Sequence, residues 1–167
     1  MPAEVPLKLQ VLKALTEHLQ GIVGPDWGDF DLSASVFRGR NRFGENDPVT
    51  MLTILEAPRP DQGREGGENN ASRSYEWSLL LQGWTTDDPV NPLDPCYYLQ
   101  EQVERRLDMI VAVKPGSGFP RHPTAYMLGG LVSSFSHGPG VVRPPTDGLS
   151  SKAFLYMSLR GGLATVV

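Results

Sequence analysis

The stretch VTMLTILEAPRPDQGREGGENNASRSYEWSLLLQGW, from Val49 to Trp84, decides the fold. It contains two apolar runs, Val49–Ala57 and Ser72–Thr85. In the second run Trp77, Leu79 and Leu81 alternate with polar residues, which is the period of a half-buried strand. Because the two runs are neighbours in the chain and oppositely directed, we expect them to pair as a long antiparallel hairpin.

The link between these strands, Pro58–Ala71, is long and polar. Loops beyond about 12–15 residues are usually functional or disordered. This composition cannot bury itself, so we expect the tip of the hairpin to become ordered only against a partner. The candidate interface residues on the tip are Arg59, Asp61, Arg64, Glu65 and Glu68.

Two helices are predicted outside the hairpin. Apolar residues recur at helical spacing over residues 6–22, and the pattern ends at Gly24-Pro25. After the sharp turn "DDPVNPLDP" a second helix is expected over residues 95–113, with Asp94 as its N-cap. Its core-facing side is expected to carry Tyr98, Val103, Leu107 and Ile110.

The remaining strands are short. Ser35–Arg40 is expected to lead through a hairpin connection, "NRFGENDP", into the strand at Val49. Towards the end of the chain we expect a strand at Leu131–Phe135, a reversal at "SHGPG" into "VVRPP", and a last strand at Ala153–Leu159 with Gly161-Gly162 after it. Residues 124–128 remain unassigned.

These elements predict one α+β domain over residues 1–167. Its centre is an antiparallel (mixed) β-sheet with two main helices packed on it and a long projecting hairpin. The chain has 167 residues, 40% of them hydrophobic, enough for a genuine core. The net charge of −4 argues against a dedicated nucleic-acid binder. The single cysteine indicates a reducing compartment, and no signal peptide or membrane span is expected.

No catalytic, cofactor or metal motif emerges from the residue pattern. His18, His122 and His137 have no His, Cys or Asp two to four residues further along the chain, so packing or surface roles are expected. Cys96 is interpreted as a small packed residue. The carboxylates that precede the second helix stand at turn and cap positions, and the glycine-rich stretches do not match a phosphate loop.

Three segments together resemble a known family: "LKLQVLKALTEHLQGI", "VFRGRNRFGENDPVTMLTILEAPRPD" and "YEWSLLLQGWTTDDPVNPLDPCYYLQEQVERRL". In order and local motif they are similar to tail terminator (tail completion) proteins of tailed bacteriophages. The resemblance covers roughly residues 7 to 113, and the last third is looser.

The resemblance implies a structural virion protein without cofactor. It would form a hexameric ring that ends the tail tube and meets the head connector or stopper protein. Genomic DNA would pass through the ring without specific binding, and assembly would take place in the host cytoplasm. An acidic chain suits such a conduit, because like charge repels the phosphate backbone.

Other functions remain open from the residues alone. The chain could be another neck or head-closure adaptor of the phage particle, or a non-viral monomeric protein-binding module that uses the Pro58–Ala71 tip. A small enzyme is the third alternative, with a site assembled from His122, Asp147 and Arg143. The molecular mass of the protein in solution distinguishes the ring protein from these alternatives.

Overall fold

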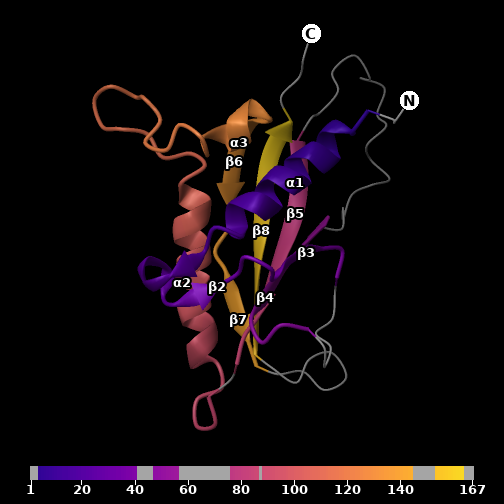
Figure 1. Ribbon diagram of the computed structural model, residues 1–167, viewed down its shortest axis with the longest axis vertical. Helices are drawn as coiled ribbons and strands as arrows, with labels where there is room; N and C mark the ends of the chain where they lie inside the picture. The colour runs from indigo at the N-terminus through magenta and orange to yellow at the C-terminus, as the bar shows by residue number, and fades with distance from the viewer. Residues whose placement is uncertain (1–3, 41–46, 57–75, 87, 145–152, 164–167) are drawn as a thin grey trace.

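The computed structural model describes residues 4–40, 47–56, 76–86, 88–144 and 153–163 (Figure 1). The helices are α1 (Leu7–Leu19), α2 (Asp94–Asp108) and the short α3 (Met127–Gly130), with a 3₁₀ turn at Pro25–Trp27. The strands are β1 (Val23–Gly24), β2 (Phe30–Asp31), β3 (Val36–Arg38), β4 (Met51–Glu56), β5 (Glu76–Trp84), β6 (Val132–His137), β7 (Val141–Arg143) and β8 (Phe154–Leu163).

The main sheet has the order β3-β4-β5-β8-β6, and β7 also pairs with β8. The predicted α+β class with a mixed, mainly antiparallel sheet is confirmed. Strands β1 and β2, which the residue pattern did not predict, form a separate two-stranded sheet. The last strand of the described residues, β8, therefore lies inside the sheet, between β5 and the edge strands β6 and β7.

The pairing of β4 with β5 is antiparallel, as expected. Its register runs from Met51 opposite Trp84 to Glu56 opposite Leu79. The predicted tip at Pro58–Ala71 lies outside the described residues, so the projecting hairpin remains a prediction. The alternation of β5 is confirmed, since Trp77, Leu79 and Leu81 are buried while Ser78 is exposed.

The expected hairpin between β3 and β4 is wrong. The two strands are parallel, with Val36 opposite Leu52 and Arg38 opposite Ile54. A parallel pair needs a crossover of about a dozen residues, and the chain between Arg38 and Met51 has that length. Turn-forming residues in "NRFGENDP" therefore belong to a crossover and not to a tight reversal.

The expected reversal at "SHGPG" is also wrong. β6 and β7 run in the same direction along one edge of β8, with His137 opposite Leu159 and Val141 opposite Tyr156. The register shifts by one residue between these two pairs, which is the mark of a bulge. Proline and glycine suit such a site because an edge strand tolerates a missing donor there.

Both main helices pack on one face of the sheet (Figure 1). On β8 this face is formed by alternate residues, Leu155, Met157 and Leu159, all fully buried. The helices contribute Val11, Leu15 and Leu19 from α1 and Cys96, Leu99, Val103 and Leu107 from α2. Burial of these side chains is the main stabilising contribution to the fold.

Three details of α2 and β8 differ from expectation. Asp94 is not the N-cap of α2, because the helix starts at Asp94, and Leu93 before it makes no side-chain capping hydrogen bond. Tyr98 points to solvent, since it lies one position off the buried row that contains Leu99. Gly161 and Gly162 lie within β8, where a side chain at Gly162 would stand 2.8 Å from Ser133 Oγ.

Candidate functional site

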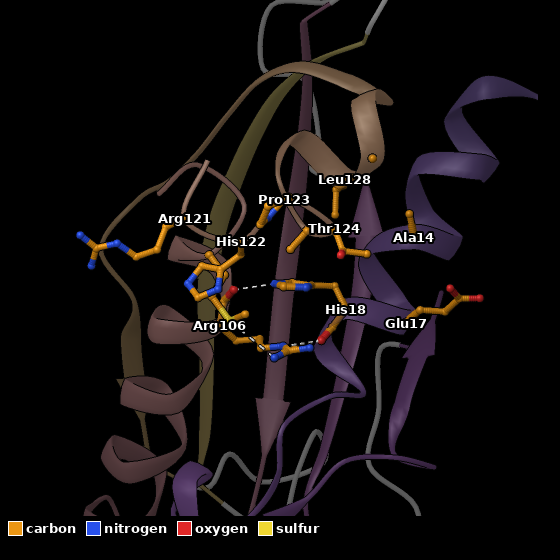
Figure 2. Close-up of a pocket in the computed structure, with 12 residues that line it drawn as sticks. Ala14, Glu17, His18, Arg106, Arg121, His122, Pro123, Thr124 and Leu128 are labelled. Atoms are coloured by element: carbon orange, nitrogen blue, oxygen red, sulfur yellow. Dashed lines mark hydrogen bonds between the residues drawn. The ribbon is translucent and has the colours of Figure 1, made fainter. Parts of the chain in front are cut away.

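An open pocket of about 660 Å³ lies where the ends of α1 and α2 meet the segment leading into α3 (Figure 2). The side chains on its helix side come from the last turns of the two helices, including His18 and Arg106. The opposite side is formed by the stretch from Arg121 to Gly129. Residues far apart in the chain therefore share one surface.

His18 and Arg106 bind each other's backbone in a reciprocal pair. The imidazole Nε2–H of His18 donates to the carbonyl oxygen of Arg106 at 2.6 Å. The guanidinium Nε–H of Arg106 donates to the carbonyl oxygen of His18 at 2.7 Å. The pair gives the carbonyl of Arg106 a donor and gives a further donor to the carbonyl of His18, which also accepts from the N–H of Gly21 at 3.2 Å, and it ties α1 to α2.

The protonation state of His18 follows from this geometry. A carbonyl oxygen only accepts, so Nε2 carries the proton and Nδ1 keeps its lone pair in the neutral ring. The side chain is 8% exposed, and burial lowers the pKa of His18 from 6.5 to about 4. The neighbouring positive charge of Arg106 acts in the same direction, while the bond to the Arg106 carbonyl opposes it. His18 is therefore a neutral hydrogen-bond donor near pH 7.

Arg106 is held on several sides. Its guanidinium lies 5.2 Å from the ring centroid of Trp27, and its Nη1 is 3.5 Å from Met109 Sδ. The backbone at Gly21 approaches the guanidinium so closely that a Cβ there would collide with it. Burial lowers the pKa of Arg106. These contacts indicate that Arg106 is a structural clamp on the end of α1.

The remaining charged groups of the pocket do not converge. Figure 2 shows Arg121 and Glu17 pointing away from the pocket on opposite sides, while the ring of His122 lies near that of His18. Within the described ranges the side chains of His122 and Thr124 form no hydrogen bond. On the wall of the pocket Leu128 has left-handed backbone, with φ of 51°, a conformation that non-glycine residues adopt only under constraint.

The interface residues predicted from the sequence all lie outside the described residues: Arg59, Asp61, Arg64, Glu65 and Glu68. Of the other candidates, Cys96 is fully buried, and burial raises the pKa of its thiol to about 12. The packed role expected for it fits this environment. His137 Nε2 lies 2.9 Å from Asp108 Oδ1. The spacing of residues along the sequence did not predict this contact, because the two residues are far apart in the chain.

The residues of the enzyme alternative are not brought together in the part of the chain that is described. His122 lines the pocket, whereas Arg143 belongs to β7 and is absent from its lining. Asp147 is outside the described residues. Across those same ranges no three His, Cys, Asp or Glu side chains are placed to hold a metal ion. None of the described helices is long and apolar enough to span a bilayer.

The local spacing of residues could not predict the contact between His18 and Arg106, because the two residues are 88 positions apart. One feature of the sequence does indicate this pair. Each residue stands in the last turn of a helix, where basic side chains complement the partial negative charge of the exposed carbonyls.

No protein-family model matches this chain, and no curated protein matches it at a significant level.

Proposed function

We propose that this chain is a structural ring protein that terminates a phage tail tube and joins it to the head connector. The observation that carries the proposal is the arrangement of its elements. An N-terminal helix, the paired strands β4 and β5, and the helix α2 follow one another in the order of the tail terminator family. The sheet with helices packed on it has the architecture that the family resemblance implies.

A ring also needs particular surfaces. Each subunit of a closed cyclic assembly presents two different, complementary surfaces to its neighbours. The clamp between His18 and Arg106 and the buried core hold α1 and α2 in fixed positions on the sheet. Surfaces at the ends of these helices are therefore presented in a fixed relation to one another, which favours closure at a defined number of subunits.

Light scattering on purified protein, followed by negative-stain imaging, tests the proposal. A single species of about six subunits with a central hole is expected. Addition of assembled tail tubes should place that ring at one end of each tube. A chain that stays monomeric at high concentration and leaves tube ends bare would contradict the proposal.

The nearest alternative is another neck or head-closure adaptor of the phage particle, and a non-viral monomeric binding module is more distant. A ring that binds the head connector but never a tube end would identify the adaptor. The net charge of −4 is compatible with either neck role, since passing DNA is repelled by an acidic lining.

A further inference from the structure

Two groups of exposed apolar side chains lie at opposite ends of α2. At its N-terminal end are Val90, Tyr97 and Tyr98, which are 81%, 54% and 67% exposed. Beyond its C-terminal end a loop carries Val113 and Phe119, and Phe119 is 69% exposed. Figure 1 shows the start of α2 near one end of the molecule and this loop, in orange, projecting near the other.

The two ends carry opposite charge. The stretch from Ser74 to Glu104 contains no Lys or Arg, and Asp88 and Asp94 stand beside the apolar group at the start of α2. The stretch from Met109 to Thr146 contains no Asp or Glu. We name Val90, Tyr97, Tyr98, Asp88 and Asp94 the acidic end. We name Val113, Lys114, Phe119 and Arg121 the basic tip.

The basic tip is an ordered structure. Lys114 N–H donates to the carbonyl of Phe119 at 2.8 Å, and Gly118 N–H donates to the carbonyl of Lys114 at 3.1 Å. Val113 pairs with Pro120 in an isolated bridge, and Gly116 and Gly118 take the positive φ that the turn requires. Phe119 is thus presented on a fixed loop, and binding through it loses little conformational entropy.

We propose that the basic tip of one copy of this chain docks on the acidic end of a second copy. Phe119 would insert between Val90 and the two tyrosines, and Lys114 and Arg121 would face Asp88 and Asp94. Aromatic side chains are enriched at the core of protein interfaces, and polar and charged groups lie on the rim around them. The inference rests on the proposed ring, because it names the two surfaces that close it.

The charges favour this head-to-tail contact over a symmetric contact between two identical surfaces. Basic tip against basic tip, or acidic end against acidic end, would bring like charges together, which is unfavourable. The tip and the acidic end are separated by the length of α2, about 22 Å for its 15 residues at 1.5 Å each. A contact between two different surfaces on one molecule propagates and either closes into a ring or extends as a filament.

The test uses two exposed substitutions, Phe119→Ser and Tyr98→Ser, in the full chain. The control is Val23→Ser, at an exposed apolar position on β1 that belongs to neither group. Circular dichroism should show all three variants folded. Light scattering should give the wild-type oligomer for Val23→Ser, and a monomer of 18.3 kDa for each of the other two.

Mixing the two defective variants is the decisive step. Phe119→Ser keeps an intact acidic end and Tyr98→Ser keeps an intact basic tip, so one contact remains available. The mixture should give a one-to-one dimer and nothing larger. A mixture that stays monomeric would overturn the proposal, as would variants that assemble like wild type.

The outcomes separate the two proposals. Wild-type rings that survive both substitutions would refute the assigned surfaces and leave the ring function standing. Wild-type protein that is monomeric at every concentration would refute both. Variants that still form rings but no longer bind tube ends would show that these surfaces serve a different protein, which also overturns the self-contact.

Discussion

The protonation state of the His18 imidazole depends on its burial. In the unfolded chain a histidine has a pKa near 6.5, and in the fold the pKa of His18 is about 4. Between these values the unfolded chain binds a proton that the folded chain does not. The free energy of unfolding should therefore fall as pH drops from about 6.5 to about 4, by up to about 3 kcal/mol.

Urea unfolding across this pH range measures the effect. Carboxylates titrate in the lower part of the same window, so the comparison needs a variant that removes only the histidine. His18→Gln keeps an N–H donor for the Arg106 carbonyl and does not titrate. Its stability should decline less steeply from neutral pH downwards, and equal slopes for both proteins would contradict the assigned pKa.

Gly21 and Arg106 should be energetically coupled. A Cβ at Gly21 collides with the guanidinium, so Gly21→Ala should displace Arg106 from the His18 carbonyl and cost about 1–3 kcal/mol. In an Arg106→Ala background that collision is absent. The cost of Gly21→Ala should then shrink by more than half, as a double-mutant cycle of unfolding free energies would measure. Additive costs would show that Arg106 does not clamp the end of α1.

At the scale of the elements, Gly83 on β5 packs closely against both neighbouring strands. A Cβ there would lie 2.7 Å from Leu52 Cδ2 and 3.3 Å from Leu155 Cγ, on the two strands that flank β5. Gly83→Ala should cost about 1–3 kcal/mol by overpacking. Gly138→Ala is the matched control, because its Cβ would meet only Ser158 at 3.8 Å and should change stability little. Similar melting temperatures for the two variants would contradict this prediction.

The elements also show which parts of the fold the residue pattern determines. Trp77, Leu79 and Leu81 predict the buried face of β5 because period-two alternation is local information. The direction in which β3 meets β4 is not local, since the same turn residues serve a hairpin and a crossover. Likewise "SHGPG" alone predicts a reversal of the chain. In the structure it is a bulge between β6 and β7, because both strands pair with β8.

The candidate site was harder to anticipate for the same reason. His18 and His122 have no partner nearby in the chain, and their shared pocket exists only because α1 and the segment before α3 pack together. Helix existence was predictable, with α1 and α2 shorter than expected by a few residues. The pairing of β4 with β5 was predicted, but the side-chain contacts between distant segments, including the Arg106 clamp, were not.

At the scale of the whole molecule, assembly and folding should be separable. Replacing Pro58–Ala71 by a tight turn leaves the paired strands β4 and β5 and the described core intact, and a shorter loop costs less closure entropy. The shortened chain should stay soluble and melt within a few degrees of wild type. Ring stability or tail completion should fall if the tip contacts a neighbour. Shortened chains that still build infectious tails would show that the tip is a tolerated insertion.

The central place of β8 in the sheet has a consequence for synthesis. β8 pairs with β5 across register positions such as Glu76 opposite Gly162, and it also supports β6 and β7. A ribosome releases β5 long before β8, so the nascent chain carries a half-finished apolar surface until β8 emerges. Completion of the sheet therefore waits for β8, and chains interrupted before β8 should be substrates for chaperones and proteases.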